Sequence, residues 1–240
     1  MSGAALIRNL VGNRRPANAP DDGLDLAKIA AMILMAVNHT LIAFPDPLRS
    51  WGYLAGRPCL PIFAFVVCVR LAQGPPERAT RMLARMLFWG VIAQPVYFAL
   101  VGTFALRLNI LFTLAAGVDL IVLVTRRHYA IAILAAVALV AADRFLDGGA
   151  VTPIAQLGAF LLLRRSYAGA LALITVAEIA DDLMVVPQLW QAALTALGAP
   201  VLVWLSLRFR PPWRPLPGVV FYIFYSLHLA VIWLAFGPYR

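Results

Sequence analysis

The sequence predicts an all-α integral membrane protein, a polytopic helical bundle with about nine transmembrane helices and a cytoplasmic N-terminus. Three observations lead to this prediction. Hydrophobic residues make up 62% of the 240 residues and charged residues 13%, whereas soluble domains have about 45–50% apolar and about 25% charged residues. Apolar runs follow one another with short polar breaks, and a helix needs about 20 such residues to cross a bilayer. Finally, Lys and Arg gather in every second break.

Breaks at Pro, Gly or charged residues define each predicted span in turn. The fifth to seventh spans are the shortest. The spans are residues 24–44, 54–72, 83–101, 106–125, 129–142, 151–163, 168–180, 189–207 and 219–236. The breaks that end them are, in the same order, Pro45, Gly74 to Pro76, Gly102, Arg126 with Arg127, Asp143 with Arg144, Arg164 with Arg165, Asp181 with Asp182, Arg208, and Gly237.

Residues 1–23 are predicted to form a cytoplasmic arm, and residues 24–240 a single transmembrane domain. Arg14 and Arg15 are followed by the polar stretch 16–22, where a signal peptide would have its apolar region, so we expect no cleaved signal.

The charge distribution predicts the orientation. With nine crossings from a cytoplasmic start, 15 of the 20 Lys and Arg residues fall on the cytoplasmic side, as the positive-inside rule requires of a bacterial inner-membrane protein. The basic residues occur in pairs and triplets without interleaved aromatic residues. We therefore expect membrane lipids, and no nucleic acid, as partners.

Two histidines lie at membrane depth, where ionisable groups are costly and are candidates for function. Asp25, Lys28, Met32, Met35 and His39 follow one another at spacings of three or four residues, which places them on one face of the first span. His228 lies in the middle of the last span among aromatic residues. An imidazole in such surroundings can act as a general base, and the alternative is that each histidine only bonds a neighbouring helix.

Arginines at the span ends are candidates for anion binding. Arg57 lies beside two prolines at the start of the second span, and Arg107 precedes Asn109 at the start of the fourth. These residues could hold a substrate carboxylate or phosphate, or anchor the chain at the interface. Arg78, Arg81 and Arg85 recur at helical spacing after a Gly-Pro-Pro turn, where they could bind the phosphates of a cofactor or simply anionic lipid. No metal-binding motif is present, and we expect no metal.

Four blocks of sequence, in this order, resemble the TraX family, which includes TrbP-like proteins of conjugative plasmids. The blocks are Asp25-Leu-Ala-Lys28-Ile-Ala with Asn38-His39, Gly56-Arg57-Pro-Cys-Leu-Pro61-Ile-Phe63, Leu108-Asn109-Ile-Leu-Phe112-Thr113, and Phe221-Tyr222-Ile-Phe-Tyr225-Ser-Leu-His228-Leu. The resemblance implies a pilin-maturation acyltransferase that moves acetyl from acetyl-CoA to the N-terminal amine of a conjugative pilin subunit.

The resemblance also implies roles for the candidate residues. We expect Asp25, His39 and His228 to be catalytic. Lys28, Arg78, Arg81 and Arg85 would bind acetyl-CoA. The substrate would contact Arg57, Arg107, Asn109, Tyr222, Tyr225 and Asn38.

One departure from the family pattern keeps other reactions open. The family commonly has Asp-His where this chain has Asn38-His39, and this difference favours the TrbP-like branch. The alternatives are a pilin cyclase that joins the pilin's two ends without CoA, and a non-catalytic pilin chaperone or assembly factor. A small transporter is disfavoured because the two halves show no repeat.

Overall fold

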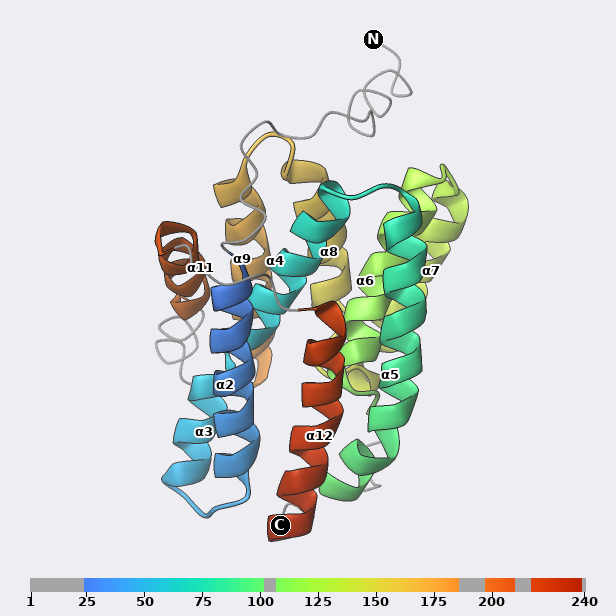
Figure 1. Ribbon diagram of the computed structural model, residues 1–240. Coiled ribbons are helices and arrows are strands. Elements are labelled where there is room, and N and C mark those ends of the chain that lie inside the picture. The colour runs from blue at the N-terminus through green and yellow to red at the C-terminus, as the bar shows by residue number, and fades with distance from the viewer. Residues whose placement is uncertain (1–23, 102–106, 186–196, 210–216, 239–240) are drawn as a thin grey trace.

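The computed structural model describes residues 24–101, 107–185, 197–209 and 217–238, with only the backbone described at residues 182, 184 and 185 (Figure 1). The predicted arm at residues 1–23 and the first part of the predicted span 189–207 lie outside these residues. Within them, every regular element is a helix, and Leu108 and Leu146 form an isolated parallel β-bridge. The predicted all-α class is confirmed.

Each predicted span overlaps a helix of the described residues, and α3 and α4 together cover the second span. Pro58 is the N-cap of α4, so the break between these two helices falls at the prolines near the start of the second predicted span. The elements are α2 (Leu24–Ile42), α3 (Leu48–Gly56), α4 (Cys59–Ala72), α5 (Glu77–Val101), α6 (Ile110–Thr125), α7 (Tyr129–Ala141), η2 (Asp143–Phe145), α8 (Val151–Leu162), α9 (Tyr167–Val185), α11 (Gly198–Arg208) and α12 (Gly218–Phe236).

Four helical stretches of the described residues are long and apolar enough to cross a membrane. They are α2, α3 joined with α4, α5, and α12. Helices α6, α7, α8 and α11 are apolar but only 10–17 residues long. Many large apolar side chains stay exposed, as expected where lipid rather than water surrounds the bundle; Leu134 is 69% and Leu234 is 75% exposed.

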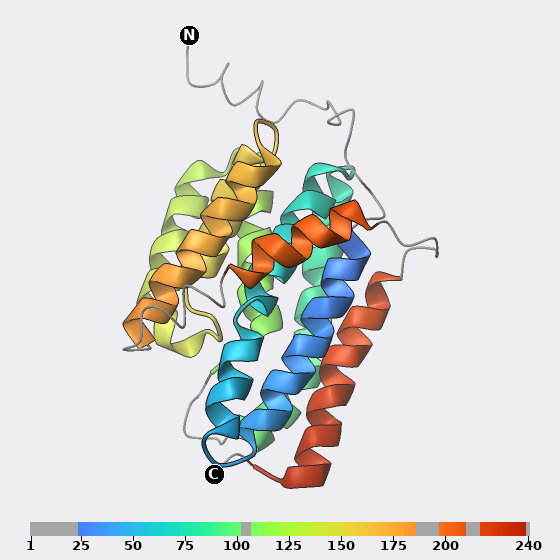
Figure 2. The same ribbon diagram turned by 90° about the vertical axis from the view of Figure 1, so that its left-hand side faces the viewer.

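Helix α4 occupies the middle of the bundle. It packs against α2, α6, α8, α9 and α11, and its side chains Ile62, Phe65 and Cys68 are at most 1% exposed. Helices α2, α12 and α5 lie beside one another along one face (Figure 1), and α11 crosses the bundle obliquely (Figure 2). The first and last helices of the described chain are therefore neighbours.

The helix directions gather the basic residues at one end. The turns α4–α5, α6–α7 and α8–α9 lie at the top of Figure 1, and α2 starts below them in the same half of the bundle; we call this half the basic end. The α2–α3 turn and the end of α12 lie at the opposite end. Basic residues on the elements of the basic end are Lys28, Arg70, Arg78, Arg81, Arg85, Arg126, Arg127, Arg164 and Arg165.

A close approach of α2 and α3 depends on Gly52. A Cβ atom at this position would lie 2.5 Å from Leu41 Cβ and 3.1 Å from the Asn38 carbonyl oxygen, which a side chain cannot do without moving a helix. We expect Gly52→Ala to lower the free energy of unfolding by about 1–3 kcal/mol, the usual cost of overpacking. Thermal unfolding in detergent, with Gly218→Ala as control, measures this effect. A Cβ atom at Gly218 would meet no other atom within 4 Å, so equal losses in both variants would contradict the prediction.

Candidate functional site

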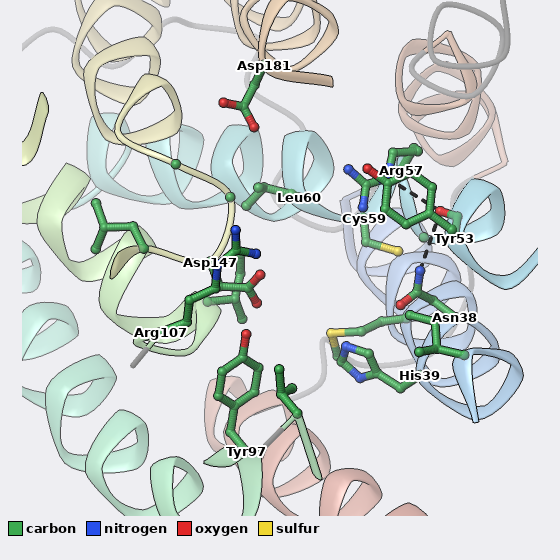
Figure 3. A pocket seen from close by; sticks show the side chains of 18 of the residues that line it. Asn38, His39, Tyr53, Arg57, Cys59, Leu60, Tyr97, Arg107, Asp147 and Asp181 are labelled. Carbon is green, nitrogen blue, oxygen red and sulfur yellow. Dashed lines mark hydrogen bonds between the residues drawn. The ribbon is translucent and has the colours of Figure 1, made fainter. Parts of the chain in front are cut away.

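Two cavities meet inside the bundle. The histidine cavity has a volume of about 420 Å³ and is lined by His39, Arg57, Tyr97, Arg107 and Asp147, with other residues (Figure 3). The basic cavity has a volume of about 480 Å³, and its lining contains all five cations Lys28, Arg70, Arg78, Arg81 and Arg85. Met35, Phe63 and Ile110 line both cavities, so the two cavities adjoin at these three residues.

His39 of α2 and His228 of α12 form a hydrogen-bonded pair. His39 Nδ1 lies 2.8 Å from His228 Nε2, and His228 Nδ1 lies 3.0 Å from the carbonyl oxygen of Phe224. The two rings are 6° from parallel. The His228 ring also stacks on Phe224, with centroids 5.0 Å apart, and Tyr225 meets it edge-on. The structure thus joins the two histidines that the sequence places 189 residues apart.

Asn38 fixes α3 against α2 beside this pair. Its Nδ2 donates to the Gly52 carbonyl oxygen at 2.9 Å, and a Cβ atom at Gly56 would collide with the same Nδ2. An ionised carboxylate has no hydrogen to donate to a carbonyl, so an amide fits this position better than Asp. Asn38 also lines the histidine cavity, but the partner of His39 is His228.

In the histidine cavity Asp147 lies beside Arg107 and Tyr97, and Arg57 lies on another side of the same cavity, beside Tyr53 (Figure 3). Arg57 lies over the Tyr53 ring at 3.8 Å, and the Tyr97 hydroxyl hydrogen bonds to Asp147. Backbone bonds place the Asp147 loop: Asp147 N–H donates to the Leu108 carbonyl at 3.0 Å. Burial raises the pKa of Asp147 from its ordinary value, while Arg57, Arg107 and the Tyr97 bond lower it.

The raised pKa of Asp147 predicts a pH dependence of stability. A carboxyl with a raised pKa in the folded state contributes stability below its ordinary pKa of 3.8 and loses that contribution as the pH rises through the folded value. The amide in Asp147→Asn does not ionise. We therefore expect the Tm of this variant minus that of the wild type to become more positive as the pH rises from about 4 to about 8. A difference that falls with pH contradicts this expectation. Asp46→Asn, which removes an exposed carboxyl that lines neither described cavity, is the control.

Carboxyl groups line another part of the histidine cavity. Asp143, Glu178 and Asp181 belong to its lining, and Asp143 Oδ1 accepts a bond from Ala150 N–H at 2.6 Å near the start of α8. Glu178 is buried and lies 2.6 Å from the Thr152 hydroxyl. The histidine cavity therefore presents both cationic and acidic groups to a ligand.

The basic cavity brings together all four residues that the sequence predicted to bind the cofactor, Lys28, Arg78, Arg81 and Arg85. Asp25 is paired with Lys28 and lies 3.3 Å from Arg70, and Arg78 donates to the Arg70 carbonyl at 3.1 Å. Asp25 thus belongs to the basic end. It lies about 21 Å along α2 from His39, at about 1.5 Å per residue, so the structure does not join it to the histidines.

Three predicted substrate-binding residues lie away from the histidine cavity. Tyr222 and Tyr225 line the basic cavity instead. Asn109 is fully buried and lines neither of the two described cavities. Its side chain accepts from Leu111 N–H at 3.0 Å at the start of α6, and it donates to the Gly90 carbonyl at 2.8 Å. Asn109 therefore joins α6 to α5.

Sequence reasoning missed Arg70, Tyr97 and Asp147 as site residues. Arg70 contributes only to the predicted membrane orientation, and Tyr97 is one aromatic residue in a long apolar run. Asp147 had the clearest signal, because an acid directly before Gly148 and Gly149 lies in a turn that is free to enter a cavity.

In the part of the chain that the structure describes, the fold and site define a helical protein with membrane-length helices, a histidine pair at one cavity and a cluster of cations at an adjoining one. The family model described as TraX protein matches residues 23–235, and the chain belongs to the TraX family. Protein TraX of Escherichia coli is 31% identical over 216 residues, covering 87% of this chain and 85% of the relative. The probable fimbrial assembly protein FimC, serogroup H1, of Dichelobacter nodosus is 29% identical over 236 residues, covering 85% of this chain and 92% of the relative. No solved structure matches the chain.

Proposed function

We propose that this chain is a multi-pass inner-membrane acyltransferase of a conjugative system, which moves an acetyl group from cytoplasmic acetyl-CoA to the N-terminal amine of a pilin subunit. The proposal rests on one observation: the two cavities adjoin at Met35, Phe63 and Ile110. The basic cavity has the cluster of cations, and the histidine cavity has His39 of the histidine pair. The relative named as a probable fimbrial assembly protein supports a pilus-related role.

The basic cavity suits the donor. Coenzyme A carries several phosphate charges, and Lys28, Arg81 and Arg85 offer ammonium and guanidinium donors around one space. Lys28 and His39 are about 16 Å apart along α2. The extended pantetheine arm has a comparable length, so phosphates held at the basic cavity leave the thioester near the histidines.

The histidine cavity suits the acceptor. With nine crossings and a cytoplasmic N-terminus, this cavity opens toward the outer side of the membrane, where the N-terminal amine of a processed pilin lies. Asp181 and Asp143 can attract the ammonium, and Arg57 and Arg107 can stabilise the oxyanion that forms on the thioester carbonyl. Membrane lipids surround the rest of the bundle.

One observation favours a second reaction, pilin cyclisation. Arg57 and Arg107 line the same cavity as His39 and could hold the carboxyl-terminal end of a pilin while its amine is activated. This reaction leaves the cationic basic cavity without a role, and we therefore place it second.

The intact mass of the pilin distinguishes these functions. The purified full chain in liposomes is mixed with pilin and acetyl-CoA that carries isotope in its acetyl group. Gain of one labelled acetyl group per pilin supports the proposal. Loss of one water without label indicates the cyclase, and an unchanged mass contradicts both enzymes and leaves a chaperone or assembly factor.

A further inference from the structure

We infer that Nε2 of His39 is the basic atom of the site and that His228 is a positioning residue that fixes the tautomer of His39. This inference rests on the proposed function for the identity of the reaction. It rests on the hydrogen bonds between α2 and α12 for the assignment of the atoms.

The hydrogen bonds determine where the protons lie. The Phe224 carbonyl oxygen can only accept, so His228 Nδ1 carries a hydrogen and donates it at 3.0 Å. In a neutral imidazole the other nitrogen, Nε2, then has a lone pair. Because His39 Nδ1 lies 2.8 Å from this lone pair, it must carry a hydrogen and donate it. The lone pair of neutral His39 is therefore on Nε2.

Position separates the roles of the two histidines. His39 belongs to the lining of the histidine cavity, whereas His228 is in the lining of neither described cavity. His228 is held on its own helix by the Phe224 carbonyl and by the rings of Phe224 and Tyr225. His228 therefore bonds to His39 without lining the cavity itself, as expected of a residue that orients a base.

The assignment gives a balanced reaction. The substrate ammonium gives one proton to His39 Nε2, and the amine nitrogen then bonds to the thioester carbonyl carbon as the carbon–sulfur bond breaks. The nitrogen loses a second proton and the departing thiolate takes one up, so the products are the acetylated amine, the thiol and one released proton. While His39 is an imidazolium, its Nδ1–H bond to His228 becomes charge-assisted and stronger.

Nitrogen NMR of the full chain in lipid bilayers, with ¹⁵N-labelled histidine, tests the inference. The sequence has three histidines, so His128→Asn and the variants at position 228 assign every signal. We expect Nδ1–H at both His39 and His228 in the wild type. In His228→Ala the Nε2–H form of His39 should appear, whereas His228→Gln should keep Nδ1–H because the Gln oxygen can accept from it.

Acetylation rates complete the test. We expect His228→Ala to lower kcat by about 10–100-fold without raising the KM for acetyl-CoA. The size of this effect is taken from residues that orient a histidine ligand in metalloenzymes. His228→Gln should recover part of the loss. An Nε2–H signal for His39 in active wild-type protein, or equal kcat in wild type and His228→Ala, overturns the inference. Wild-type protein that leaves the pilin mass unchanged overturns the proposed function instead, whatever the tautomer.

Discussion

Replacing His39 by alanine is expected to lower the rate of pilin acetylation by about 10²–10⁴-fold, the usual contribution of a general base. His39 lines the histidine cavity and is held by His228, and in the described residues His228 itself does not line that cavity. The label that appears in pilin per unit time, measured with the variant reconstituted in liposomes, gives the rate.

His128→Ala is the matched control for His39→Ala. His128 is the remaining histidine, an exposed residue at the start of α7, and it lines neither described cavity. We expect this variant to keep its full rate. If His39→Ala folds and inserts like the wild type and also retains its rate, the assignment of the site to the histidine cavity is wrong.

Replacing Arg81 by alanine is expected to raise the KM for acetyl-CoA by about 10–100-fold, because a hydrogen bond to a charged group is worth about 1.5–3 kcal/mol. Arg85→Ala should have a similar effect, since both side chains line the basic cavity. The kcat at saturating acetyl-CoA should change much less, because the histidine cavity is untouched.

The KM of the wild type for acetyl-CoA should also rise with salt concentration, as expected for phosphate binding by cations.

Arg165→Ala tests whether the effect belongs to the basic cavity or to positive charge at that end. Arg165 is exposed in the turn after α8, also at the basic end, and it lines neither described cavity. Its KM should stay at the wild-type value. Equal KM changes for Arg81→Ala and Arg165→Ala, or none for either, would place the donor elsewhere.

The candidate site was only partly readable in the sequence. Helical spacing placed Arg78, Arg81 and Arg85 on one face of α5, and the structure puts all three in the lining of the basic cavity. The same reasoning grouped Asp25 with His39, although the structure separates them by about 21 Å along α2. Helical spacing shows on which face of a helix a residue lies. It does not show at which point along the helix that face borders a cavity.

The amino-acid sequence by itself determined the all-helical class and the order and approximate ends of most of the described helices, because apolar runs interrupted by Pro, Gly and charge depend only on neighbouring residues. It also determined that His39 and His228 would each lie within an apolar helix. Only the tertiary structure decided that His39 meets His228, that Asp147 enters the histidine cavity, and that Asn109 bonds to α5 instead. These contacts join residues far apart in the chain, and they depend on how helices pack against one another, which local periodicity does not encode.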